Sequence, residues 1–273
     1  MKRYFVVIFL GVFSLSLITS CKKDKGEPPI LPPAKSMTID FSNFETGKKG
    51  DSAISVPKGT QTSNWEFSAG VALLWKTIIY TTLAVPVTSF QLAVNQTPTY
   101  VTDKTWQWSV NATVLNTTYK GRLTGQIAST NVVWKMYITK EGTGGFNDFL
   151  WFEGTSDFDG LGGQWILYLS PTSPVKVVKI DWEKTSESVG NIKYTYIKTG
   201  DNFLDSYIEY GLTTSALNAY YTIHYYDTSF LQFFDLNVEW NSTLHNGRVK
   251  SQGHFGTTDW YCWDGNYLNV TCP

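Results

Sequence analysis

The chain has 273 residues, of which 42% are apolar and 16% charged, and this composition excludes a largely disordered protein. Lys and Arg (22) nearly balance Asp and Glu (23), so the basic excess typical of nucleic-acid-binding proteins is missing. Aromatic residues are abundant, with 11 Trp, 16 Tyr and 16 Phe. We therefore expect large rings to dominate the packing.

The first residues have the pattern of an export signal. Lys2 and Arg3 form a basic start, residues 4–18 are almost entirely apolar, and the stretch closes with the letters ITSC, ending at Cys21. These closing letters resemble the lipobox of bacterial lipoproteins, in which the cysteine carries lipid and becomes the first residue of the mature chain. The resemblance implies a signal peptide at 1–20, lipidation of Cys21 and attachment to a membrane of the cell envelope.

The segment that follows is charged and then rich in proline. Residues 22–33 read KKDKGEPPILPP, and four prolines in six positions favour extended polyproline II structure. We expect residues 21–36 to form a tether without a fold of its own. By resemblance to sorted lipoproteins, Lys22 after the lipidated cysteine favours the outer membrane. The charged run resembles part of the export tag of Bacteroidota surface lipoproteins, and the protein's orientation, periplasmic or surface-facing, stays open.

Two further cysteines, Cys262 and Cys272, remain near the end of the chain. Because an exported protein meets an oxidising environment, we expect them to form a disulfide that pins the C-terminal end. A metal site on two cysteines lacks the spacing and partner ligands of known zinc sites. We expect neither a metal ion nor a cofactor.

A helix is predicted over about residues 64–95. Ser63 and Glu66 form a capping-box pattern, and apolar residues then occupy nearly every side, which predicts a buried helix. Pro86 is expected to end or kink it. Ahead of it, alternating apolar residues at 37–41 predict a short strand, followed by a polar loop.

From residue 105 onward the apolar residues recur with a period of two. About eleven such segments are separated by turn signals such as Asn246-Gly247, and none of the connections is long enough for a crossover helix. The prediction is a mainly β fold. A large antiparallel meander of about 11 strands curls into an open or closed barrel around the N-terminal helix, in one domain over residues 37–273.

This order of elements, a leading helix and then a meander, resembles the half-barrel lipid carriers of the Lol system. The resemblance implies a concave apolar face that holds acyl chains. The candidate lining residues are Trp75, Ile78, Trp106, Trp108, Trp134, Trp165, Trp182 and Trp240. The alternative is that the same rings simply fill the core.

Ionisable residues give little sign of catalysis. Asp181 and Glu183 share a strand face, as a pair of glycosidase carboxylates would, but Lys179 lies on the same face and favours a solvated surface. The three histidines lack metal-ligand spacing, and no serine stands in a nucleophile elbow. We therefore expect a protein that is not an enzyme.

Three functions remain open. The first is a lipid-anchored envelope protein that binds or carries an apolar ligand such as a lipid. The second is a surface glycan-binding lipoprotein that uses aromatic residues expected on the outer face, namely Trp151, Tyr137 and Tyr168. The third is a structural envelope lipoprotein without a small ligand.

Overall fold

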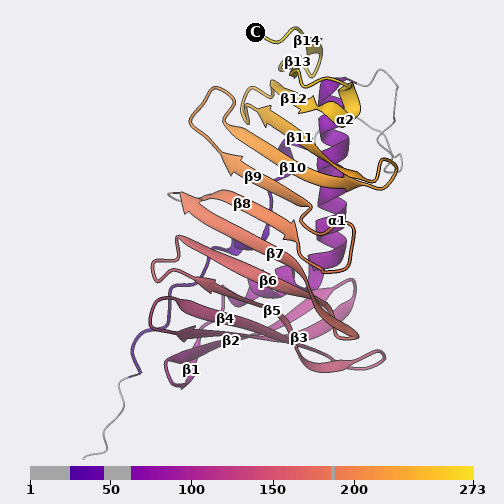
Figure 1. Ribbon diagram of the computed structural model, residues 1–273. Coiled ribbons are helices and arrows are strands. Elements are labelled where there is room, and N and C mark those ends of the chain that lie inside the picture. Colours follow the sequence, from indigo (N-terminus) through magenta and orange to yellow (C-terminus); the bar gives the residue numbers. More distant parts are fainter. Residues whose placement is uncertain (1–24, 46–62, 186–187) are drawn as a thin grey trace, which may run out of the picture.

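A single antiparallel sheet dominates the computed structural model, which describes residues 25–45, 63–185 and 188–273 (Figure 1). Each strand pairs with its neighbours in the chain, from β1 to β14. The strands are β1 (Thr99–Thr102), β2 (Thr105–Val114), β3 (Thr117–Ile127), β4 (Val132–Lys140), β5 (Phe146–Ser156), β6 (Gly162–Ser170), β7 (Ser173–Thr185), β8 (Ser188–Tyr196), β9 (Tyr207–Leu212), β10 (Ala219–Asp227), β11 (Gln232–Trp240), β12 (Gly247–Ser251), β13 (Tyr261–Trp263) and β14 (Asn269–Val270). The helical elements are η1 (Ala34–Met37), η2 (Ser42–Phe44), α1 (Asn64–Ala93) and α2 (Gln252–Phe255).

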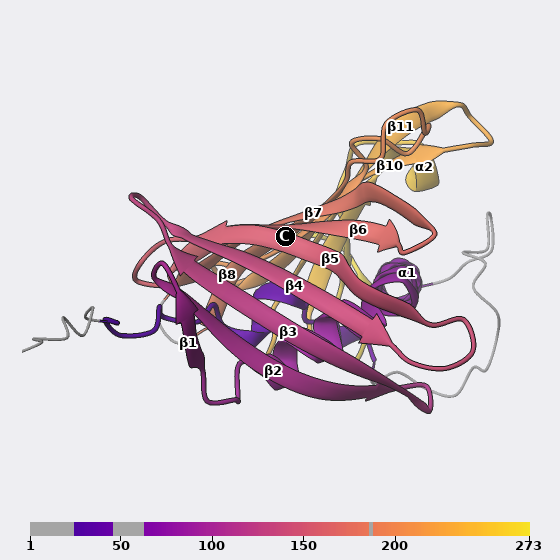
Figure 2. The same ribbon diagram turned by 90° about the horizontal axis from the view of Figure 1, so that it is seen from below.

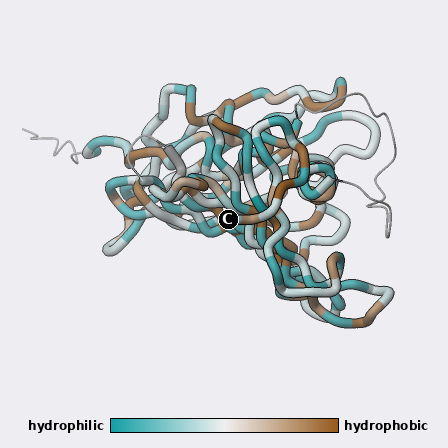
Figure 3. Tube along the Cα trace, turned by 90° about the horizontal axis from the view of Figure 1, so that it is seen from above, coloured by the Kyte–Doolittle hydropathy of each residue, from teal (hydrophilic) through white to brown (hydrophobic). Residues whose placement is uncertain are grey.

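The sheet twists and curves so that one face turns toward α1 (Figure 2). We call this the concave face and the opposite one the convex face. Hydrophilic and hydrophobic stretches are interspersed along the chain (Figure 3), and buried positions alternate with partly exposed ones along β4, as expected when one face is buried. The predicted antiparallel meander is confirmed. The sheet is not closed, since β1 and β14 are its two edges, so the barrel of about 11 strands is not confirmed.

Strand β5 shows why the sequence underestimates the number of strands. Residues 149–152 read FLWF and break the alternation, because the pairing with β4 shifts by one residue between Met136 and Tyr137. This bulge turns Trp151 toward Phe146 and Phe149, and the Trp151 side chain is only 9% exposed. The expectation that Trp151 lies on the outer face is wrong, whereas Tyr137 and Tyr168 are partly exposed as predicted.

Helix α1 begins as predicted and bends as predicted. The Ser63 hydroxyl accepts a hydrogen bond from the Glu66 amide, and the Glu66 carboxylate accepts one from the Ser63 amide. The helix then runs through Pro86 to Ala93, with a bend of 70° between its two arms, Asn64–Tyr80 and Thr82–Ala93. A proline ring clashes with the carbonyl four residues earlier, which here belongs to Thr82.

The two ends of α1 are packed, whereas its middle is packed on one side only. Phe67 stacks on His254 of α2, and Phe90 contacts Trp165 of β6. Between them, Leu73 is 50% exposed and Tyr80 68%. The expectation of a helix buried on all sides is therefore wrong, because the sheet supports α1 mainly near its ends.

The N-terminal segment lies against the concave face. Pro29, Pro32 and Ser36 are buried, so the part of the expected tether from residue 29 to 36 is packed against the domain. Residues 38–41 form no strand, although alternate side chains point inward as the pattern predicts. The carbonyls of Met37 and Asp40 accept hydrogen bonds from tyrosine hydroxyls and have no strand partner.

Glycines on the concave face make room for tryptophan rings. Gly125 pairs with Trp134 and Gly154 with Trp165 across neighbouring strands. A Cβ atom on either glycine would lie 2.5 Å from the facing indole. Large rings can therefore lie flat over the backbone of the next strand, which explains how so many indoles fit on one face.

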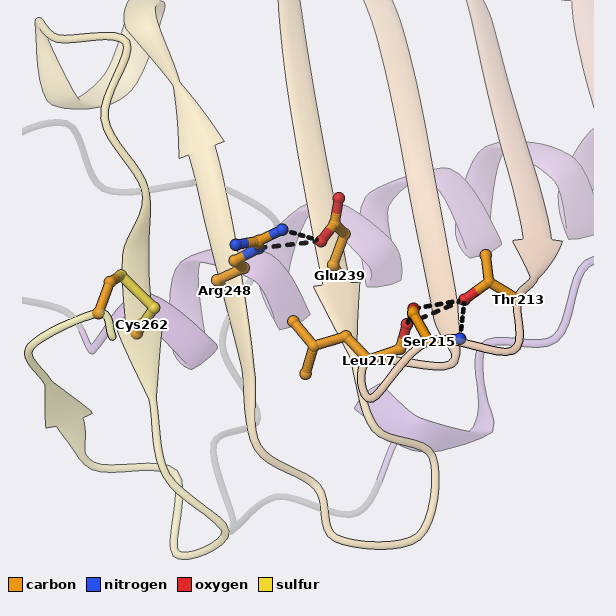
Figure 4. Close-up of polar contacts among 7 residues, drawn as sticks. Thr213, Ser215, Leu217, Glu239, Arg248 and Cys262 are labelled. Carbon is orange, nitrogen blue, oxygen red and sulfur yellow. Dashed lines mark hydrogen bonds and ion pairs between the residues drawn. A yellow bond between two sulfur atoms is a disulfide. The ribbon is translucent and has the colours of Figure 1, made fainter.

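The C-terminal end is joined to the start of α1. Cys262 and Cys272 form the predicted disulfide, and the Cys262 carbonyl accepts a hydrogen bond from the Asn64 side chain. In Figure 4 the disulfide lies on the strand next to β12, with α1 behind it. The structure thus places the disulfide where the helix meets the last strands.

Candidate functional site

The predicted ligand-lining residues do gather on the concave face. Trp108, Trp134, Trp165, Trp182 and Trp240 belong to one buried core, and Trp75 and Trp106 pack against it. Ile78 does not, because it lies on the outward side of α1 and is 47% exposed. The period-two pattern therefore predicted the correct strand face for the tryptophans, whereas the prediction that Ile78 of the helix lies in the same core is wrong.

The chain's own N-terminal segment occupies the space in front of these rings. Met37, Ile39, Phe41 and Phe44 are buried in the same core. Phe44 lies 5.0 Å from the ring of Trp240. In the described residues, the surface expected to hold acyl chains is thus covered by side chains of the protein itself.

Hydrogen bonds fix this segment in place. The Tyr194 and Tyr221 hydroxyls donate to the carbonyls of Met37 and Asp40, and the Trp165 indole donates to the Ser36 hydroxyl at 3.2 Å. Burial raises the pKa of the Tyr194 phenol, and burial followed by the charge of Asp40 raises that of Tyr221. Both phenols therefore stay neutral and remain donors at neutral pH.

Several indole N–H groups in the described part of the chain have no acceptor among its residues. They belong to Trp65, Trp106, Trp108, Trp182 and Trp240. An unpaired buried N–H group costs about 1–3 kcal/mol. The concave layer is thus well packed but not fully satisfied in hydrogen bonding.

The convex face carries an ordered row of three rings, Tyr207 of β9, His224 of β10 and Phe233 of β11, with Lys193 of β8 at its start. We call these four residues the ring row. The Lys193 ammonium lies 3.7 Å from the Tyr207 ring centroid. Tyr207 stacks on His224 at 5.5 Å, and His224 on Phe233 at 4.5 Å with an interplanar angle of 4°. The row is held by strand register, since Tyr207 and Asp235 are the cross-strand partners of His224.

The ring row ends at a hollow of about 670 Å³, which we call the Phe233 hollow. It lies between β11, the end of β12 and the short helix α2. Its lining includes Phe233, Asp235, Asn237, Lys250 and Gln252. Phe233 lines the hollow, and its ring also contacts His224 and Tyr226. An apolar ring face is thus combined with carboxylate, amide and ammonium groups.

The polar groups of this region are held in position. The Asp235 carboxylate lies 2.7 Å from His224 Nδ1, and Lys250 lies over the Trp260 ring at 4.8 Å. Next to them, the Arg248 guanidinium on β12 binds the Glu239 carboxylate on β11 (Figure 4). Such preorganisation lowers the entropic cost of binding a ligand.

The other ionisable candidates, Asp181, Glu183 and His254, lie in separate places and form no common site. Asp181 forms an ion pair with Lys179 at 2.8 Å, as the shared strand face predicted, and Glu183 is exposed. His254 stacks on Phe67, and burial lowers its pKa, so it is neutral at neutral pH. Within residues 25–45, 63–185 and 188–273, no group of three or more His, Cys, Asp or Glu side chains is arranged to hold a metal ion.

The ring row has no signal in the sequence, because it depends on how neighbouring strands pair. Alternation along a strand assigns each side chain to one face of the sheet, but it does not give the register between strands. The loop of four residues between β10 and β11, residues 228–231, also hides which rings come together. Only the pairing of β10 with β11 brings His224, Phe233 and Asp235 side by side.

The expected signal peptide and the lipidated Cys21 lie outside the described residues. Within them, no single helix is long and apolar enough to cross a membrane, and the two bent arms of α1 meet that criterion only when taken together. Comparison of the chain with protein-family models, curated proteins and solved structures finds no match. The fold and the site must therefore be interpreted from their own geometry.

Proposed function

We propose that this protein is a lipid-anchored, non-enzymatic protein of the bacterial cell envelope that binds carbohydrate in the Phe233 hollow. The observation that carries the proposal is that the Phe233 ring lines this hollow together with Asp235, Asn237 and Lys250. A sugar ring presents C–H groups on its faces and hydroxyls at its edge. An aromatic face surrounded by hydrogen-bonding side chains matches both properties.

The arrangement of the concave face supports this choice over an apolar lumen. The rings that could line a lumen are covered by residues 37–44, whereas the Phe233 hollow borders solvent and needs no rearrangement to accept a ligand. A largely preformed site is the usual case for small ligands. We therefore favour carbohydrate binding, which needs fewer additional assumptions than lipid carriage.

Calorimetric titration with cellohexaose, xylohexaose and mannohexaose tests the proposal. Phe233→Ala is expected to weaken binding of the recognised hexaose at least tenfold, about 1.4 kcal/mol. Leu231→Ala is the matched control, since Leu231 is 72% exposed on the same hairpin and does not line the hollow. Absence of binding by the wild-type protein to all three sugars, or equal binding by Phe233→Ala, would overturn the proposal.

The anchor is a separate part of the proposal. Residues 1–21 supply the export signal and the lipidated cysteine, and the segment up to residue 28 joins the anchor to the packed domain. Replacing Cys21 with Ala is expected to move the protein from the membrane fraction to the soluble fraction of the envelope. Continued membrane association of the Cys21→Ala variant would contradict this assignment.

Carriage of an apolar ligand is a second candidate, favoured by the unpaired indoles and by the exposed apolar middle of α1. A lipid whose polar group accepts hydrogen bonds could satisfy these indoles if it displaced residues 37–44. Native mass spectrometry of the Cys21→Ala protein, with and without solvent extraction, distinguishes the two. A discrete co-purifying lipid mass would support carriage, and a clean protein mass would contradict it.

A further inference from the structure

A second hollowed surface lies on the convex face at the other end of the sheet. Two hollows of about 330 and 370 Å³ adjoin each other over β2, β3, β4 and β5, and they share Lys120 and Thr139 as lining residues. We call this surface the Arg122 groove. The lining is rich in amides and hydroxyls: Gln107, Ser109, Asn111, Asn116, Thr117, Thr118, Thr139 and Thr143.

Arg122 lines this groove and is held there by a carboxylate and an aromatic ring. Its Nε and Nη2 atoms donate to the two carboxylate oxygens of Asp148 at 2.9 and 2.6 Å. The guanidinium also lies 4.0 Å from the centroid of the Tyr137 ring. The Asp148 amide in turn donates to the Thr139 hydroxyl at 2.9 Å. A guanidinium clamped in this way cannot turn away from a ligand, which gives the site directional donors.

The pair keeps both of its charges over a wide pH range. The hydrogen bond from Arg122 lowers the pKa of the Asp148 carboxyl, and the same bond raises the pKa of Arg122. The bidentate contact uses Nε and Nη2, so the remaining N–H groups of the guanidinium and the second lone pairs of the carboxylate can serve a ligand. Donors and acceptors thus lie side by side, as adjacent sugar hydroxyls require.

The charge of the groove favours a neutral ligand. Lys120 is paired with the Glu141 carboxylate and Arg122 with Asp148, which leaves Lys140 as the one lining cation outside these pairs. A groove for a polyanion would need several unpaired cations. The balance of charges and the hydroxyl-rich lining both match an uncharged polyhydroxylated chain.

We propose that the Arg122 groove is a second carbohydrate site, which binds a neutral oligosaccharide segment through the Arg122–Asp148 pair, the Tyr137 ring and the surrounding amides. This proposal rests on the proposed function, because it assigns the same class of ligand to a second place. Two sites on one face make the protein divalent for polysaccharide. Divalency raises apparent affinity for a polymer without any new contact.

The test measures stoichiometry by calorimetry with the hexaose that the wild-type protein binds. Two equivalents are expected for the wild type, and one each for Asp148→Asn, Tyr137→Ala and Phe233→Ala. Asp148 has a φ of 50°, a conformation that Asn also tolerates, so Asp148→Asn is expected to remain folded. Lys135→Ala is the control on the same face of β4, since Lys135 lines neither hollow.

The outcomes separate the two proposals. Two equivalents retained in both Asp148→Asn and Tyr137→Ala would overturn the Arg122 groove and leave the Phe233 hollow intact. Loss of one equivalent in Asp148→Asn, with two retained in Phe233→Ala, would support the groove and overturn the hollow. Absence of binding by the wild-type protein would overturn both.

Discussion

At the scale of single residues, cross-strand pairs of tryptophan and glycine shape the concave face. A glycine in a strand interior normally weakens the strand, because it brings no side chain to pack. Here the facing indole covers the glycine, so the area that a side chain would bury is supplied by Trp134 or Trp165 instead. The position tolerates nothing larger than hydrogen.

Replacing Gly154 with Ala tests this explanation. The added Cβ would lie 2.2 Å from the Gln164 carbonyl oxygen and 2.5 Å from the Trp165 ring, and at least one of these is backbone that cannot move easily. We expect a loss of about 1–3 kcal/mol in the free energy of unfolding, measured by urea denaturation. The control is Thr155→Ala on the opposite face of β5. Equal midpoints for the two variants would contradict the account.

The convex face adds hydrogen-bonded phenols that are partly buried, such as that of Tyr220. The Tyr220 hydroxyl donates to the Glu209 carboxylate at 3.0 Å, and Asn191 donates to the same carboxylate. Burial, followed by the bond and charge of Glu209, raises the pKa of Tyr220 to about 12. A phenol with a raised folded-state pKa stabilises the fold fully below its unfolded value of about 10.

Stability is therefore expected to fall as the pH rises from about 10 toward 12. Tyr220 is only one contributor, because the pKa values of Tyr168, Tyr196 and Tyr210 are also raised to about 12. Urea midpoints measured at pH 9 and pH 11 should differ more in the wild-type protein than in Tyr220→Phe. The same loss of stability in both proteins would show that Tyr220 makes no contribution.

Only part of the candidate site could be predicted from the residue types and their spacing. The period-two pattern correctly predicted that five of the candidate tryptophans lie in one buried set. It could not show that residues 37–44 cover them, since those residues are remote in sequence and make no strand. Nor could it predict the ring row, which depends on the register of β9, β10 and β11.

At the scale of elements, local signals were most reliable where the physics is local. The capping box at Ser63 and the proline bend of α1 each depend on atoms within four residues of one another, and both are found as predicted. The missed strand β5 depends on a bulge, which is a property of pairing with β4. The packed N-terminal segment depends on contacts with β6, β8, β10 and β11, which are distant in sequence, and it has no local signature.

The cap at Ser63 offers a quantitative test at this scale. Ser63→Ala removes the acceptor of the Glu66 amide, and we expect a loss of about 1 kcal/mol in the free energy of unfolding. Thr82→Ala is the matched control, since Thr82 is an exposed position of the same helix. An unchanged denaturation midpoint in Ser63→Ala would mean that the observed cap contributes nothing to stability.

At the scale of the whole molecule, the open sheet uses its two faces differently. The concave face is covered by α1 and by the chain's own N-terminal segment, which together replace the closure of a barrel. The convex face bears the paired charges, the ring row and the three hollows. In this account, the concave face maintains the fold, and the convex face binds the ligand.

Indole N–H signals in a proton–nitrogen correlation spectrum can test which face binds the ligand, because each tryptophan gives its own signal. Trp260 contacts Lys250 at the Phe233 hollow, whereas Trp108, Trp182 and Trp240 lie in the concave core. Each indole signal is assigned with a Trp→Phe variant. When the protein is saturated with the hexaose that it binds, we expect the Trp260 signal to shift and the signals of the concave indoles to stay unchanged. Shifts of the concave indoles with an unchanged Trp260 would contradict this expectation.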